Sequence, residues 1–136
     1  MRVVLDTNIL VSALLSTVGK PAIICDAWED GHFTLLSCAQ QLDEIREALK
    51  IQRIAVRIKP HSAGRFISQI KSFAEHISPL PTVKRSPDPD DDFLLALSEA
   101  GRADYFVTGD KHGLLSLRRH KGTQIVSAGK FAELVS

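Results

Sequence analysis

Acidic residues stand where apolar runs of the sequence end. Asp6 follows the apolar run 3–5, Asp110 follows the run 103–108, and four acids lie within 88–92, just before an apolar helical segment. Short continuous apolar runs are typical of buried strands in a parallel sheet. The carboxyl ends of such strands share one edge, where open α/β sheets place their ligands. Because Mg²⁺ and Mn²⁺ prefer carboxylate and water ligands, we expect these acids to converge on a divalent-metal site.

Each of these acids also has a purely structural interpretation. Asp6 could cap the following helix through its side chain. The 88–92 run could supply an N-cap and an anionic first turn, which complement the helix dipole. Asp110 could be an ordinary turn residue, and Glu44, considered alone on its helix, would be a surface residue. One cap needs one acid, however, and four acids within five residues repel each other unless cations or solvent screen them.

The composition is that of a globular chain of ordinary domain size. Its 136 residues are 44% apolar and 24% charged, and the formal net charge is +1, so a polyanion must be held by a local basic patch or through metal. Cys25 and Cys38 lack metal-ligand spacing and predict buried, reduced thiols. No run approaches the length of a membrane span, and the first residues do not resemble a signal peptide. We therefore expect a single domain over residues 1–136, located in the cytoplasm and without a membrane partner.

Segments of strand-like and helix-like periodicity alternate along the chain. The strands are predicted at 3–5, 32–37, 103–108 and 123–127, with at best an irregular edge strand in 76–83, where Pro79 and Pro81 interrupt pairing. The helices are predicted at 8–15, 22–30, 39–49, 51–59, 61–75, 92–101, 114–119 and 128–135. This alternation predicts an α/β fold built on a parallel sheet.

Four segments, 5–14, 37–49, 88–97 and 103–110, are weak motifs singly but specific as an ordered set that spans nearly the whole chain. In this order and spacing they resemble the PIN-domain family of small metal-dependent ribonucleases, most closely the branch of toxin components of toxin–antitoxin systems. The resemblance implies a three-layer α/β/α fold whose central parallel sheet has the strand order 3-2-1-4-5. It also implies an acidic pocket that holds one or two Mg²⁺ or Mn²⁺ ions.

The resemblance assigns catalytic or metal-binding roles to acids from four segments. Asp6, Glu44, Asp91 and Asp110 match the family's acidic positions, which raises Glu44 from a surface residue to a site residue. Asp91 fits the family's Asp-Pro-x-Asp pattern, and a shift of one residue would give the ligand role to Asp92 instead. The metal ligands implied are therefore Asp6, Asp91 or Asp92, and Asp110.

Other polar residues near these acids fit supporting roles. Asn8 and Thr108 fit the role of groups that orient the ligands. Lys84, Arg85 and Lys111 lie near the acids in the sequence and are candidates to contact the RNA backbone.

The function that the resemblance implies is that of a toxin endoribonuclease, a hydrolase that cleaves single-stranded RNA with a metal-activated water. A small antitoxin protein and a homodimer are the implied partners. The alternative is a catalytically weak or inactive module that binds RNA or a protein, which is favoured by the low net charge and by Lys111 and His112, since many family members carry a further acid at that point. A phosphotransfer domain is disfavoured, because an Asp-x-Asp nucleophile site would need an acid at Asn8.

Overall fold

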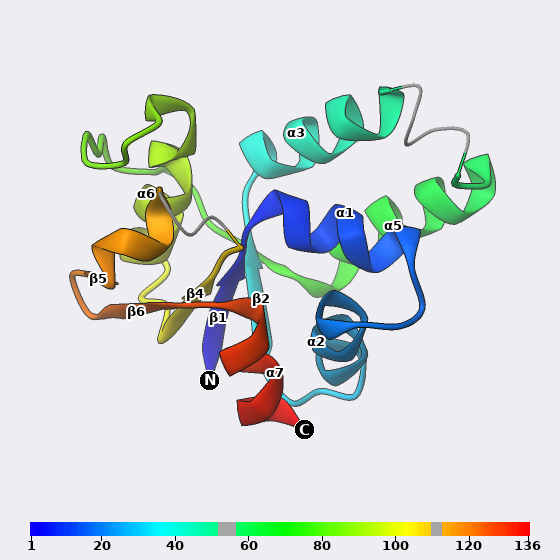
Figure 1. Cartoon of the computed structure of the whole chain (residues 1–136). Coiled ribbons are helices and arrows are strands. Elements are labelled where there is room, and N and C mark those ends of the chain that lie inside the picture. Colours follow the sequence, from blue (N-terminus) through cyan, green and yellow to red (C-terminus); the bar gives the residue numbers. More distant parts are fainter. Residues whose placement is uncertain (52–56, 110–112) are drawn as a thin grey trace.

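A computed structural model describes residues 1–51, 57–109 and 113–136. In these residues six strands form one sheet in the order β3-β2-β1-β4-β6-β5, which is parallel except for the β5–β6 pair (Figure 1). The strands are β1 (Arg2–Leu5), β2 (Thr34–Ser37), β3 (Glu75–His76), β4 (Tyr105–Val107), β5 (Arg119–His120) and β6 (Thr123–Val126). The predicted parallel α/β sheet is confirmed, and its five parallel strands follow the predicted order.

Helices connect the strands and cover both faces of the sheet. They are α1 (Thr7–Leu15), α2 (Lys20–Glu29), α3 (Ala39–Lys50), α5 (Pro60–Phe73), α6 (Asp92–Ala100) and α7 (Ala128–Val135), with 3-10 turns η1 (Pro89–Asp91) and η2 (Leu114–Leu117). The helix predicted at 51–59 falls largely outside the described residues. No single helix in the described ranges is long and apolar enough to span a membrane, and only α1 and α2 taken together, bent by 96°, meet such a test on length and composition.

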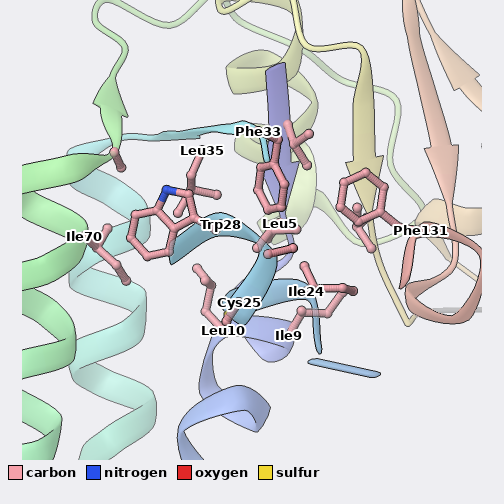
Figure 2. Close-up of a cluster of buried hydrophobic side chains, with 14 of the residues drawn as sticks. Leu5, Ile9, Leu10, Ile24, Cys25, Trp28, Phe33, Leu35, Ile70 and Phe131 are labelled. Carbon is pink, nitrogen blue, oxygen red and sulfur yellow. The ribbon is translucent and has the colours of Figure 1, made fainter. Parts of the chain in front are cut away.

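The apolar residues of the strands alternate between two cores, one on each face of the sheet. Val3 and Leu5 of β1 face the core formed with α1, α2, α5 and α7, whereas Val4 faces the core formed with α6. Figure 1 shows these helices on opposite sides of the sheet, and Figure 2 shows Trp28 of α2 beside Leu35 and Ile70 in the larger core. This burial on both faces explains why the strand sequences are continuously apolar.

The two edges of the sheet differ from the prediction. The irregular edge strand expected within 76–83 is confirmed only at its start, where His76 belongs to β3; the prolines that follow have no N–H to donate, and the pairing does not continue through them. The helix predicted at 61–75 ends at Phe73, before β3. The helix predicted at 114–119 is only the 3-10 turn η2, which ends where Arg118 adopts a φ of 63° and the chain turns into the antiparallel strand β5.

Candidate active site

Asp6 is a buried carboxylate at the carboxyl edge of the sheet. Strands β1 and β4 end in register, with Leu5 opposite Val107, so Asp6 and Thr108 emerge side by side. The Thr108 hydroxyl donates to Asp6 Oδ2 at 2.8 Å, and the Asn8 N–H donates to Asp6 Oδ1 at 3.2 Å as Asp6 caps α1. The cap predicted for Asp6 is therefore confirmed, and the carboxylate is fixed in one orientation with 7% of the residue exposed.

Glu44 brings a second carboxylate to the same edge from α3. It is half-buried, and burial is the largest cause that raises its pKa above the ordinary value. The negative charges of Asp6 and Asp90 raise this pKa further, while a hydrogen bond from the Thr7 hydroxyl opposes the shift. Glu44 forms no ion pair with a lysine or arginine in the described ranges. Negative charges from three segments therefore lie close together here, and no basic side chain is paired with Glu44.

Gln41 is a buried positioning residue that the sequence analysis did not identify. Its Oε1 accepts a hydrogen bond from the Ser37 hydroxyl at 2.7 Å, and its Nε2 donates to the Leu5 carbonyl at 2.7 Å. These bonds tie the first turn of α3 to the ends of β1 and β2, one helical turn before Glu44. The available signal was the position of Gln41 beside the apolar stripe of its helix, where a buried amide needs partners.

The acids of the 88–92 run have two kinds of role, since Asp88 caps a helical turn and Asp90 lies near the candidate site. Asp88 accepts the N–H of Asp90 at 3.0 Å and caps η1, as predicted. Asp91 is half-buried at the N-cap position of α6, and its predicted metal role stays a prediction. Asp90, which the sequence analysis assigned only to a helix turn, has its charge close enough to influence Glu44.

Asp92 holds the segment that precedes the run. Its Oδ1 accepts the backbone N–H of Arg85 at 3.0 Å and that of Ser86 at 2.7 Å. A role for Asp92 as a metal ligand stays a prediction, but this oxygen already fixes the loop.

The predicted RNA-contact residues lie in different surroundings. Lys84 is exposed, whereas Arg85 Nη1 donates to the Arg119 carbonyl at 2.6 Å and lies 3.0 Å from His120 Nδ1, at the β5 edge. Lys111 falls outside the described residues. These contacts dock the Arg85 guanidinium on β5, so Lys84 is the freer of the two to reach a phosphate.

The set of carboxylates is of the kind that Mg²⁺ or Mn²⁺ prefers, although one predicted ligand is not described. Asp110 follows Thr108 by two residues but lies outside the described ranges, as does His112. Within those ranges no three His, Cys, Asp or Glu side chains are close enough to hold a metal ion. The clustered negative charge around Glu44 nevertheless fits a cation better than an anion.

A hollow of 560 Å³ opens beside these carboxylates, between α3, the segment 80–83 and α6. Glu44, Asp90 and Asp92 lie on its wall. A larger hollow of 820 Å³ lies between α2 and α5, lined by Trp28 among others, and contains none of these acids. The chemistry of the carboxylates therefore assigns the candidate site to the smaller hollow.

Comparison with known proteins agrees with this geometry. Residues 2–112 match a family model described as PIN domain. Searches of curated proteins and of solved structures gave no match.

Proposed function

Because the chain belongs to the PIN domain family, whose members are typically metal-dependent nucleases, we propose that it is a metal-dependent endoribonuclease that cleaves single-stranded RNA. The single observation that supports this most strongly is the convergence of Asp6 and Glu44, with the charge of Asp90, at the carboxyl edge of the sheet. Carboxylates gathered at such an edge are suited to a divalent cation, and the family generally uses Mg²⁺ or Mn²⁺.

In this proposal each acid has a distinct task. Asp6, Asp91 and Asp110 hold the cation, and Thr108 and Asn8 keep the Asp6 carboxylate turned toward it. A bound Mg²⁺ or Mn²⁺ would stabilise charge on the phosphate and lower the pKa of a water molecule.

Glu44 is the residue that we assign to the attacking water. Its carboxylate accepts a hydrogen bond from Thr7, which orients it at the edge of the sheet. Burial, the largest cause, raises its pKa above the ordinary value, and a carboxylate with a raised pKa is a stronger proton acceptor than an ordinary glutamate. The products would be a 3′-hydroxyl and a 5′-phosphate.

The partners follow from the family rather than from contacts in this chain. PIN domains generally bind RNA and often pair with antitoxins, so we propose a toxin that is restrained by a small antitoxin protein in the cytoplasm, with a homodimer as its assembly. Growth arrest on expression, relieved by Asp6→Asn, is the expected sign of a toxin.

The direct test is cleavage of a labelled single-stranded RNA set with Mn²⁺, with Mg²⁺ and with chelator. Asp6→Asn should abolish cleavage while leaving the fold intact, because asparagine also caps helices well. Asp43→Asn, which changes an exposed acid on α3, is the matched control and should cleave normally. Equal cleavage by wild type and Asp6→Asn would contradict the assignment.

The same experiment decides the alternative of a catalytically weak or inactive binding module. Lys111 and His112 follow Asp110 in place of the further acid that many family members carry, which is the observation that favours it. Such a module would bind the RNA or a protein partner but leave every RNA of the set uncut with either metal.

A further inference from the structure

His120 of β5 is a buried histidine whose two ring nitrogens both have charged partners. Its Nδ1 lies 3.0 Å from Arg85 Nη1, and its Nε2 lies 3.0 Å from Glu99 Oε1 of α6. Only 5% of the residue is exposed, so these two side chains take the place of water around the ring nitrogens. Neither His120 nor Glu99 belongs to the carboxylates at the carboxyl edge of the sheet.

The two partners determine which nitrogen of the ring carries the proton. A guanidinium group has only donors, so His120 Nδ1 accepts from Arg85 and carries no hydrogen. A carboxylate accepts, so Nε2 carries the hydrogen and donates it to Glu99. The ring is therefore neutral in this arrangement. A second proton on Nδ1 would set two N–H donors and two positive groups against each other at the same 3.0 Å separation.

The elements packed around the ring add few other charges. β6, which pairs with β5, carries no charged residue. α6, which packs beside β5 (Figure 1), carries Glu99 in its last turn. Arg85 and Glu99 are therefore the charged groups in hydrogen-bond contact with the ring. The other charged residues of α6, of the turns beside β5 and of the segment before Arg85 are Asp92, Arg118, Arg119, Lys121 and Lys84.

Arg85 connects the His120 ring to the segment that leads into the acid run. Its guanidinium is held by His120 and by a carbonyl of β5 at 2.6 Å, and its backbone N–H donates to Asp92 Oδ1 at 3.0 Å. Pro87 and Pro89 follow, and the fixed φ of proline leaves this stretch few ways to absorb a displacement. A shift of the Arg85 side chain is therefore passed on to the acid run.

We infer that His120 is a positioning residue of the candidate site, whose neutral, Nε2-protonated ring fixes Arg85 and through it the acid run. A second proton on the ring releases the guanidinium, so this hold is sensitive to pH. The consequence for metal binding rests on the proposed function, whereas the hold of His120 on the segment does not.

The first arm of the test follows the wild-type chain by NMR, without metal or RNA. The pH is lowered from about 8, within the range where histidines usually change charge, until the His120 ring signals show the second proton. At the higher pH the ring nitrogens should report a neutral ring protonated at Nε2. The backbone amide signals of Ser86 and Asp91 should then shift with the same midpoint as the ring. Amides that keep their positions while the ring titrates, or a ring protonated at Nδ1 at the higher pH, would overturn the inference.

The second arm compares two variants that each retain one contact of the ring. His120→Asn places an amide near the position of Nδ1 and can still accept from Arg85, whereas His120→Gln places it near Nε2 and can still donate to Glu99. Calorimetry at a pH of about 8 should give His120→Asn a Mn²⁺ affinity close to wild type. The affinity of His120→Gln should fall about 3- to 10-fold, which corresponds to the loss of one hydrogen bond that supports the site.

The matched control is His61→Gln, which changes an exposed histidine on α5 and should bind Mn²⁺ as wild type does. On acidification the wild-type affinity should fall through the midpoint of the His120 ring, and His120→Asn, which keeps Asp92 but has no imidazole, should lack this step. Equal affinities of His120→Asn and His120→Gln, or an acid step that persists in His120→Asn, would overturn the inference. If both variants fail to fold, the wild-type titration of the first arm decides.

The two arms separate this inference from the proposed function. Amides that follow the His120 ring in a chain that binds no Mn²⁺ would support the hold of His120 on the acid run and refute the divalent-cation site. Mn²⁺ binding that is identical in wild type and both His120 variants would support the cation site and overturn the inference.

Discussion

Replacing Gln41 by methionine should destabilise the protein by about 2–6 kcal/mol. Methionine is similar to glutamine in length and flexibility, so little packing is lost, but both 2.7 Å hydrogen bonds disappear. Each neutral bond contributes about 0.5–1.5 kcal/mol, and the buried Ser37 hydroxyl that is left without its partner costs about 1–3 kcal/mol more. The sum predicts a clear shift of the urea midpoint with an unchanged slope.

The double variant Ser37→Ala with Gln41→Met tests the reasoning behind this magnitude. Removing both partners leaves no orphaned hydroxyl, so the double variant should be more stable than Gln41→Met alone. Gln124→Met, at an exposed position, is the control and should change stability by less than about 0.5 kcal/mol. A loss below about 1 kcal/mol for Gln41→Met would refute the view that this amide fixes α3 and therefore Glu44.

Three further predictions concern single side chains. Because the pKa of Glu44 is raised in the folded protein, wild-type stability falls as the pH rises from the pKa of the unfolded state through that of the folded state. Glu44→Gln removes this loss, so it should stabilise the chelator-treated protein at neutral pH. Urea titrations should show the gain fading near pH 4. Thr108→Val should lower Mn²⁺ affinity about 10- to 100-fold by calorimetry, because the hydroxyl orients Asp6, and unchanged affinity would contradict that role. Burial raises the pKa of the Cys25 thiol to about 12, so iodoacetamide at pH 8 should label it only after denaturation, as mass spectrometry would show.

The central sheet could be predicted because its strands are buried on both faces. Val3, Val4 and Leu5 form a continuous apolar run, and all three are fully buried, so the sequence signal has a direct physical cause. The two-residue edge strands β3 and β5 left no such signal. Glu75 and His76 of β3 are exposed and contribute no apolar pattern, and β5 depends on the turn at Arg118.

Site residues could be predicted where both the residue type and its position in the chain indicate a site. Asp6 at a strand end met both conditions, and Thr108 was placed beside it by the register of two strands. Gln41 and Asp90 were missed as site residues because their roles depend on how α3 and η1 lie against the sheet, which local periodicity does not encode. The position of Asp110 lies outside the described residues, so its ligand role stays a prediction.

Calorimetric titration of Mn²⁺ into the chelator-treated full chain tests the cation site most directly, because it requires neither RNA nor turnover. Wild type should bind with saturable heat and gain thermal stability that rises with the logarithm of metal concentration above Kd. Asp6→Asn should lose at least tenfold in affinity, and Asp43→Asn should behave as wild type. Identical titrations for wild type and Asp6→Asn, or the absence of any binding, would contradict a divalent-cation site at this edge of the sheet.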